Sequence, residues 1–426
     1  MRHGWSSRYG GPSDDRGQAV AVDQSGNIYV TGYFIDSVDL GGGVLTSAGV
    51  HDIFLASFTR AGKHRWSKRF GAGTIHDRGE ALVVDGQGNV VVTGEFKGKA
   101  SFGGQTLTGA GERDVFLASF TPAGDHRWSK RLGGAGYDYA QALGVDGSGN
   151  LALAGLFEGT VDLGGGELKS AGGYDIFLAS FTPEGKHRWS HGFGASEDDY
   201  ATAVAVDASG NVYLGGTFQM SAGFGGAELS SAGASDALLA KYSPSGAHLW
   251  SKRFGGQLDD AGPEVVVGDP GVLLAGHFEG TVDLGGGDLT SAGGWDIFLS
   301  RYSAAGKHQV SRRFGGASAD QVSGVALDPR GGVIVTGTFS GTSSLGGGDL
   351  AAAGEEDLYI ARYDVDGRHL WSRALGGPKP DASHAVAADA DGRVVVTGCF
   401  EGEADLGGGV LKSAGGFDIF VLTVER

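Results

Sequence analysis

The sequence predicts an all-β fold, a seven-bladed β-propeller built from four-stranded antiparallel blades. Three observations predict it. A repeat of about 61 residues runs through the 426-residue chain, each repeat holds four short strand-like segments, and the two chain ends carry complementary parts of one repeat. A repeat of this length indicates an array of similar supersecondary units, and four strands per unit are typical of propeller blades around a central channel.

The repeat is clearest in the segment WSKRFGG and its variants. The copies are spaced by 60 to 62 residues and begin at Trp5, Trp66, Trp128, Trp189, Trp250, Val310 and Trp371. Seven such periods account for the chain, so we expect a single domain over residues 1–426. The expected blades span about 11–70, 71–132, 133–193, 194–254, 255–314, 315–375 and 376–426 plus 1–10.

Each repeat contains four candidate strands. The first is an apolar run such as residues 19–23, and an Asp-x-x-Gly-Asn turn joins it to the second, residues 27–34. The third, residues 52–58, leads through a glycine-containing turn into the fourth, residues 64–70. The first strand is apolar on both faces and is expected to be innermost, whereas the fourth alternates in character and is expected at the outer edge.

The chain ends distinguish a closed ring from an open solenoid. The chain begins with a fourth strand, around Trp5, and ends with a third strand, residues 418–424. We therefore expect residues 2–10 to pair beside residues 417–424. This pairing would complete the last blade and remove the exposed strand edge of an open array.

The repeat also resembles a known family. The Asp-x-x-Gly-Asn turn, the Thr-Gly-x-Phe strand end and the Gly-x-x-x-Trp step are similar to the bacterial β-propeller repeat called SBBP, and more distantly to the NHL repeat. The resemblance implies a bacterial protein that is often secreted or attached to a surface. It implies little about activity, because propellers host enzymes, lectins and docking scaffolds. Repeat five departs from the pattern with a shortened turn at residues 267–271, and repeat six has Val310 in place of tryptophan.

Composition excludes other classes of protein. Glycine accounts for 82 residues without the period of collagen, and no apolar run approaches the ~20 residues of a membrane span. With 33 basic and 50 acidic side chains the net charge is −17, which argues against nucleic acid as a partner. Cys399 is the single cysteine. The chain starts without a targeting signal, and we expect a monomer. The SBBP resemblance implies that the parent protein is exported to the cell surface or the medium.

One face of the propeller is expected to collect the longer connections, which run from strand four to the next strand one and from strand two to strand three. We call it the long-loop face, and loops on rigid scaffolds often carry binding sites. A recurrent aspartate lies there before each first strand, and such carboxylates could hold Ca²⁺ or fix the crossover by accepting backbone N–H bonds. These aspartates are Asp15, Asp77, Asp138, Asp199, Asp260, Asp320 and Asp381.

Two other positions vary between repeats. One precedes a second recurrent aspartate and holds His51, Arg113, Tyr174, Ser235, Trp295, Glu356 and Phe417; the other lies in the second strand and includes Tyr33 and His277. Variable side chains at equivalent positions of a constant backbone could together form one composite pocket, although relaxed drift at exposed sites explains the same variation. We expect Tyr33, Tyr174, Trp295 and Phe417 to stack on a ligand, with His51 and Arg113 beside them.

A histidine also stands two residues before each tryptophan position, from His3 to His369. These residues fall on outer strands too far apart for a shared metal, so we expect them to pack beside the tryptophan ring.

The leading functional hypothesis is a non-enzymatic binding module that recognises a glycan or a protein on the long-loop face. No cofactor is expected, and Ca²⁺ is the candidate ion. One alternative is a polysaccharide lyase or hydrolase that uses His51, His76, Arg113 and His277 near the channel mouth. A thiol–imidazole pair of Cys399 with His277 or His384 is a weaker variant of this alternative. The other alternative is a purely structural scaffold.

Overall fold

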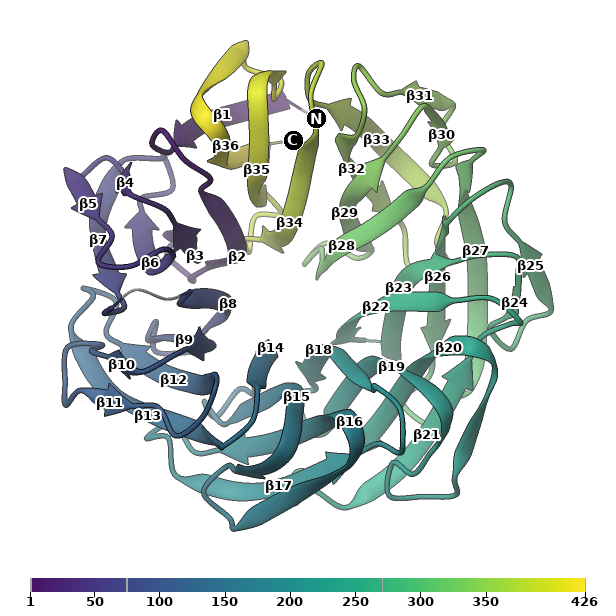
Figure 1. The fold of residues 1–426 in the computed structure, drawn as a ribbon. Coiled ribbons are helices and arrows are strands. Elements are labelled where there is room, and N and C mark those ends of the chain that lie inside the picture. Colours follow the sequence, from purple (N-terminus) through teal and green to yellow (C-terminus); the bar gives the residue numbers. More distant parts are fainter. Residues whose placement is uncertain (1, 74–75, 270, 426) are drawn as a thin grey trace.

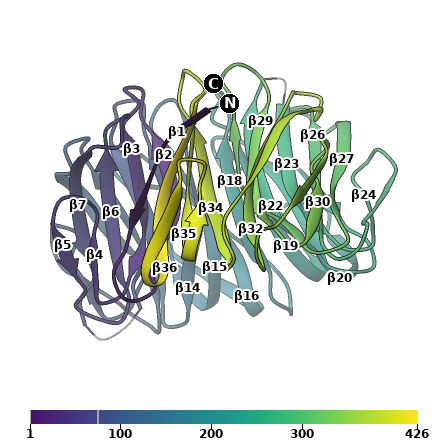
Figure 2. The same cartoon turned by 90° about the horizontal axis from the view of Figure 1, so that it is seen from above.

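The computed structural model describes residues 2–73, 76–269 and 271–425. Its strands form four-stranded antiparallel sheets arranged around a central opening (Figure 1). Turned by 90°, the sheets stand side by side with their strands running between the two faces of the ring (Figure 2). None of the described residues belongs to a helix long and apolar enough to cross a membrane.

Each sheet has the same order of strands from the central opening outward. The first strands are β2 (Arg16–Val22), β8 (Arg78–Val84), β14 (Asp138–Val145), β18 (Tyr200–Val206), β22 (Asp260–Gly268), β28 (Asp320–Leu327) and β34 (Asp381–Ala388). The second strands are β3 (Ile28–Phe34), β9 (Val90–Phe96), β15 (Leu151–Asp162), β19 (Val212–Ala222), β23 (Gly271–Phe278), β29 (Val333–Phe339) and β35 (Val394–Asp405).

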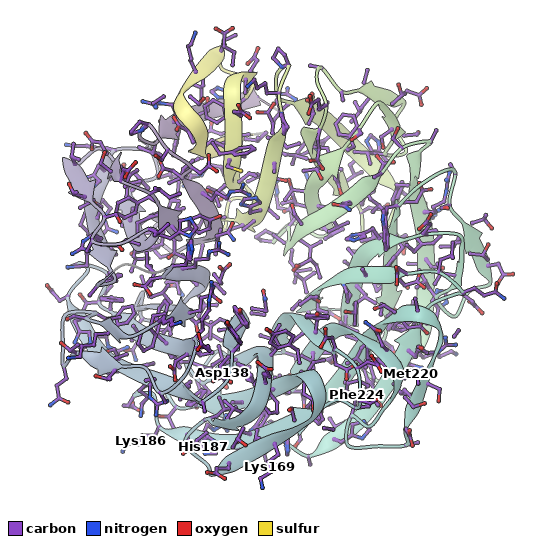
Figure 3. All side chains as sticks on the ribbon, in the orientation of Figure 1. Asp138, Lys169, Lys186, His187, Met220 and Phe224 are labelled. Atoms are coloured by element: carbon purple, nitrogen blue, oxygen red, sulfur yellow. The ribbon has the colours of Figure 1, made fainter. Side chains whose placement is uncertain are left out.

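The third strands are β6 (Asp52–Phe58), β12 (Asp114–Phe120), β16 (Glu167–Phe181), β20 (Leu229–Tyr242), β26 (Asp296–Tyr302), β32 (Asp357–Tyr363) and β36 (Val410–Glu425). The fourth strands are β7 (His64–Phe70), β13 (His126–Gly134), β17 (His187–Phe193), β21 (His248–Phe254), β27 (His308–Gly316), β33 (His369–Leu375) and β1 (Arg2–Tyr9). Strands pair in this order within each sheet, for example β2–β3–β6–β7. Figure 3 shows Asp138 toward the central opening and Lys186 and His187 at the outer rim.

The connection between second and third strands projects as a small hairpin. In some sheets it forms separate strands: β4 (Ser37–Asp39) with β5 (Val44–Thr46), β10 (Lys99–Ala100) with β11 (Leu107–Thr108), β24 (Thr281–Asp283) with β25 (Asp288–Thr290), and β30 (Thr342–Ser344) with β31 (Asp349–Ala351). Elsewhere the second and third strands themselves extend into the hairpin, as in β15 and β16. Short pairings of β13 with β15 and of β27 with β30 also join neighbouring sheets.

The apolar core lies in layers between neighbouring sheets. Every residue of β3 and β6 is buried, because each face of these strands meets another sheet. In one such layer Ile53 and Leu55 of β6 pack with Val92 of β9 and Phe116 of β12. The repeat therefore produces a repeated interface, and no sheet buries its apolar faces without its neighbours.

The expected turn between first and second strands is present. In the first repeat the Asp23 carboxylate accepts hydrogen bonds from the backbone N–H groups of Ser25 (2.8 Å) and Asn27 (2.9 Å). In repeat five Gly268 pairs directly with Gly271 across the shortened turn.

The outer-strand histidines do not pack on tryptophan as expected. His64 lies edge-on to Phe58 at 6.2 Å and its Nε2 is 3.1 Å from the hydroxyl of Ser67. Its ring fills the place where a Cβ of Gly42 would stand, only 2.2 Å away, so the Gly-Gly-Gly turn of the projecting hairpin closes over the histidine. Trp66 instead donates its indole N–H to the carbonyl of Pro122 (3.1 Å) in the next sheet.

The predicted closure is confirmed. Strand β1 pairs antiparallel with β36, from Arg2 opposite Glu425 to Tyr9 opposite Ile419. The backbone N–H of Trp5 also donates to the hydroxyl of Thr423 at 3.0 Å. The N-terminal strand thus becomes the outer strand of the sheet that the C-terminal segment builds.

Candidate functional site

The long-loop face rests on a frame of buried aspartates. The seven aspartates that precede or begin the first strands are at most 1% exposed. Asp138 accepts a backbone hydrogen bond from Gly134 (2.7 Å), and Asp77 accepts one from Lys97 (3.1 Å). Burial raises the pKa of Asp15, Asp77, Asp138, Asp260 and Asp381 to about 7 and the pKa of Asp199 and Asp320 to about 6.

The second recurrent aspartate lies at the start of the buried part of each third strand and usually pairs with an arginine. The arginine donates from the fourth strand of the same sheet in the pairs Arg8–Asp418, Arg69–Asp52, Arg131–Asp114, Arg253–Asp236 and Arg313–Asp296. Asp175 and Asp357 lack this pair, because Gly192 and Ala374 occupy the arginine position.

The two aspartates of neighbouring sheets meet across a glycine. A Cβ on Gly71 would lie 2.8 Å from the Asp77 carboxylate and 2.9 Å from that of Asp52, and the φ of Gly71 is 126°. Only glycine fits this crossover without strain. In the described part of the chain no group of three or more His, Cys, Asp or Glu side chains is placed to hold a metal ion. Ca²⁺ binding by these aspartates stays a prediction.

The variable positions on this frame form an unbroken series of contacts along one arc. This series, the arginine–tyrosine arc, runs in Figure 1 from the yellow sheet through purple and blue to teal. It comprises Phe417, Arg16, Tyr33, His51, His76, Arg78, Glu95, Arg113, Tyr137, Tyr139, Tyr174 and Tyr200.

The first part of the arc stacks arginines on aromatic rings. The guanidinium carbon of Arg16 lies 4.8 Å from the ring centroid of Phe417, and that of Arg78 lies 4.8 Å from that of Tyr33. Tyr33 is the cross-strand partner of Arg16 and is only 8% exposed. Tyr33 therefore supports Arg78 from below, and its ring is not open for stacking on a ligand.

Two histidines meet beside this stack. The Nδ1 atoms of His51 and His76 are 2.6 Å apart, and the ring of His51 also packs on Tyr33 at 4.7 Å. Burial lowers the pKa of His51 to about 4, with further lowering by His76, Arg78 and Arg113. At neutral pH one neutral imidazole can donate this hydrogen bond to the other.

The second part of the arc is rich in tyrosine. Arg113 pairs with the buried Glu95 and lies 5.6 Å from the ring centroid of Tyr139. Tyr139 contacts Tyr174 at 6.0 Å, and Tyr174 contacts Tyr200 at 6.4 Å between centroids. Tyr200 is 37% exposed, which makes it the most accessible ring of the series.

The rest of the ring, from β19 to β35, carries mostly small or non-aromatic side chains at the same positions. This opposite arc comprises Thr217, Ser235, Ala261, His277, Trp295, Gln321, Thr338, Glu356, Ala382 and Cys399. Trp295 lies here, edge-on to His277 at 4.9 Å. The structure thus brings together five of the six expected ligand-binding residues, while Trp295 and His277 form a separate pair.

A channel opens beneath the face. It is lined by one polar side chain from each first strand, and its cavity volume is about 260 Å³. The lining residues are Gln18, Glu80, Gln141, Thr202, Glu264, Ser323 and His384. Bulges in the first strands, such as the register shift around Gln18, account for this polar row between apolar neighbours.

Cys399 lies close to the channel residue His384, with Sγ 3.9 Å from Nε2. Burial raises the pKa of the Cys399 thiol to about 12 and lowers the pKa of His384 to about 4. An activated thiolate requires the opposite shift, so this pair has the electrostatics of a packed thiol.

Arg16, Arg78 and the polar side chains that line the channel were not among the residues predicted from the sequence. We call these lining side chains the channel row. Arg16 and Arg78 directly follow the recurrent aspartate, at a position that also varies between repeats as Tyr139, Tyr200, Ala261, Gln321 and Ala382. Comparing this position across repeats would have found them. The channel row depends on strand bulges, which leave no comparable signal in the spacing.

Comparisons with known proteins agree with the repeat architecture. The SBBP β-propeller repeat matches residues 4–33, which confirms the resemblance. The chain is 22% identical, over 93% of its length, to an uncharacterized WD repeat-containing protein of Acanthamoeba polyphaga mimivirus. It is 24% identical, over 63% of its length, to the regulatory protein FlaEY of Caulobacter vibrioides. The chain spans 31% and 30% of the lengths of these relatives.

Solved structures that match the chain include Sqt1 from Chaetomium thermophilum. It has a TM-score of 0.47 and 12% identity, and the match covers 100% of this chain and 99% of Sqt1. A subtype N10 neuraminidase-like protein of A/little yellow-shouldered bat/Guatemala/060/2010 gives a TM-score of 0.40 at 8% identity, covering 80% and 93% of the two chains.

Proposed function

We propose, from the premise that this is a β-propeller repeat protein of the SBBP type, that it is a closed, seven-bladed propeller acting as a non-enzymatic glycan-binding module. The expected blades, from residues 11–70 to 376–426 plus 1–10, are its units. The ligand site is the arginine–tyrosine arc on the long-loop face, at the mouth of the channel.

One observation carries the proposal: aromatic and arginine side chains contact one another along one arc, while equivalent positions elsewhere are mostly small. The repeats act as internal controls. A residue required for folding recurs in every sheet, as the aspartates do, so a contact series confined to one arc serves something other than the common fold. Tyrosine rings offer flat contact area at low entropic cost and a hydroxyl for hydrogen bonding, a combination suited to sugar rings.

The experiment is a glycan array followed by calorimetric titration of the best glycan. Tyr174→Ala and Tyr200→Ala are expected to weaken binding about tenfold each, the effect of losing one stacking side chain. Trp295→Ala is the matched control, since it removes an aromatic ring from the same face but outside the arc. Equal losses in all three variants would extend the site to the opposite arc. Unchanged affinity in the two tyrosine variants would refute the arc as the site.

A protein ligand is the principal competitor, and an array without hits followed by capture of a defined protein partner would favour it. We also propose that the protein is a monomer, and that it acts outside the cell, the second of which the SBBP resemblance implies. Light scattering of the purified chain tests the first point, and localisation in the source bacterium tests the second.

A further inference from the structure

Arg16 and Arg78 differ from most arginines of the described chain, because their charges have no partner. Neither side chain forms an ion pair or a hydrogen bond with another described residue, and the Nε atoms of both are buried and unsatisfied. By contrast, Arg69, Arg131 and Arg313 each pair with a buried aspartate. A guanidinium carries five N–H donors, and leaving buried donors unsatisfied is costly.

The lack of partners is notable in a chain with 50 acidic residues and a net charge of −17. The carboxylates nearest to the two arginines have other partners. Glu80 accepts a hydrogen bond from Gln18 (3.0 Å), Glu95 pairs with Arg113, and Asp14 accepts the backbone N–H of Phe417 (3.0 Å). No described carboxylate therefore forms an ion pair with either arginine, although burial raises the pKa values of Glu80 and Glu95 and the nearby charge of Arg78 opposes that rise.

The two guanidinium groups are also held in place. Arg16 lies on Phe417 and Arg78 lies on Tyr33, each at 4.8 Å, and Tyr33 is the cross-strand neighbour of Arg16. Burial raises the pKa of Tyr33 and the charges of both arginines oppose that rise, so both guanidinium groups lie near its hydroxyl. Stacking on an aromatic ring fixes the plane of a guanidinium and leaves its edge free to bind a carboxylate through two parallel N–H bonds.

We propose that Arg16 and Arg78 bind the carboxylate of an acidic glycan, a uronic acid unit, at the mouth of the channel. This inference rests on the proposed glycan-binding function and specifies its ligand class. The neighbouring rings of Tyr139, Tyr174 and Tyr200 supply contact surface for the adjoining sugar units. Arg113 contributes less charge, because Glu95 already neutralises it.

The test compares acidic oligosaccharides with neutral versions of the same chain length. Tetragalacturonate and tetramannuronate, and their methyl esters, are titrated into the full chain by calorimetry. The acids are expected to bind at least tenfold more tightly than the esters, and 500 mM NaCl is expected to weaken the acids severalfold relative to 50 mM.

Variants then test whether Arg16 and Arg78 supply the positive charge that binds the carboxylate. Arg16→Gln and Arg78→Gln are each expected to lose about tenfold in affinity for the acids and little for the esters. Arg368→Gln is the matched control, because it removes the same charge from a side chain that is 69% exposed on a turn joining a third to a fourth strand. Arg16→Lys and Arg78→Lys keep the charge but lose the planar donors, and should fall between wild type and glutamine. Thermal melts establish that each variant is folded.

The outcomes separate this inference from the function on which it rests. If acids and esters bind equally well to the wild-type chain, the carboxylate inference is overturned and glycan binding survives. If hexaglutamate binds and no glycan on the array does, an acidic peptide is the ligand and both proposals fail. The absence of any binding also overturns both.

Discussion

The two arcs of the long-loop face share one frame and differ in what they display on it. In both arcs the recurrent aspartates lie at the same crossovers and accept the same backbone bonds, as Asp138 and Asp320 do from Gly134 and Gly316. Yet one arc stacks arginines and tyrosines in sequence, and the other carries mostly small or non-aromatic side chains, some of them buried, around one pair of His277 and Trp295. The recurrent aspartates therefore belong to the common fold, whereas the side chains at the variable positions are what distinguishes one arc from the other.

If the recurrent aspartates stabilise the fold in both arcs, the free energy of unfolding lost on replacing one of them should depend only on the partners of that aspartate. Asp114→Ala leaves the partly exposed Arg131 without its partner, and we expect a loss of about 3 kcal/mol in the free energy of unfolding. Asp357→Ala, in a sheet where Ala374 replaces the arginine, should cost about 1–2 kcal/mol through the lost backbone bond to Ala353 alone. Urea unfolding measures both, and a larger cost at Asp357 would contradict the assignment.

The frame should also give a characteristic pH dependence. Because the pKa values of Asp15, Asp77 and Asp138 rise to about 7 on folding from an unfolded value near 4, the folded protein binds more protons in this range. Their contribution to stability is complete below about pH 4 and is lost as the pH rises through about 7. The melting temperature is therefore expected to increase by several degrees from pH 8 to pH 6.

The rise should flatten at lower pH. His277 and His384 have pKa values lowered to about 4 by burial, so their contribution to stability is lost as the pH falls from about 6.5 to 4. Asp138→Asn and Asp260→Asn, one from each arc and both with a pKa of about 7, should reduce the pH 8 to pH 6 rise by similar amounts. A melting temperature that falls between pH 8 and pH 6 would show that these carboxylates stay ionised.

A smaller effect distinguishes paired from unpaired arginines within the arginine–tyrosine arc. Glu95→Gln removes the carboxylate that neutralises Arg113 and should raise affinity for tetragalacturonate about threefold, with a steeper salt dependence. Calorimetry at two salt concentrations measures it. Glu356→Gln in the opposite arc is the control, and equal gains in both variants would indicate a general charge effect.

The smallest effect is expected at Cys399. Its thiol is 1% exposed and burial raises its pKa to about 12, so iodoacetamide should leave the folded chain unlabelled at pH 8. Cys399→Ala should leave glycan affinity unchanged. Rapid labelling would reopen the enzymatic hypothesis based on a thiol–imidazole pair with His384.

The sequence was informative wherever one residue type performs the same task in every repeat. The turn at Asp23, the closing strand around Trp5 and the recurrent aspartates could all be predicted, because each depends on local geometry and on the repeat count. The histidine packing could not, because Phe58 lies on another strand and Gly42 lies in the turn of the projecting hairpin, so their contact with His64 depends on how that hairpin folds back.

The candidate site could be predicted only in part. Tyr174 and Phe417 were identified by their variability, but the same criterion selected Trp295, since a linear comparison does not show which variable residues touch. Nor does it show that Tyr33 lies beneath Arg78. Which variable residues touch, and that Tyr33 lies beneath Arg78, depends on contacts between neighbouring sheets. These contacts follow from the geometry of the ring.

Ring closure by β1 also has a mechanical consequence. Arg2 lies opposite Glu425, so both chain ends leave the ring at the same end of the β1–β36 ladder (Figure 2). A force pulling the two ends apart would act across the first rung of this ladder and break its hydrogen bonds one after another, instead of loading all of them together in shear. Under tension between its ends, the ring should therefore open at this seam while the other sheets remain folded.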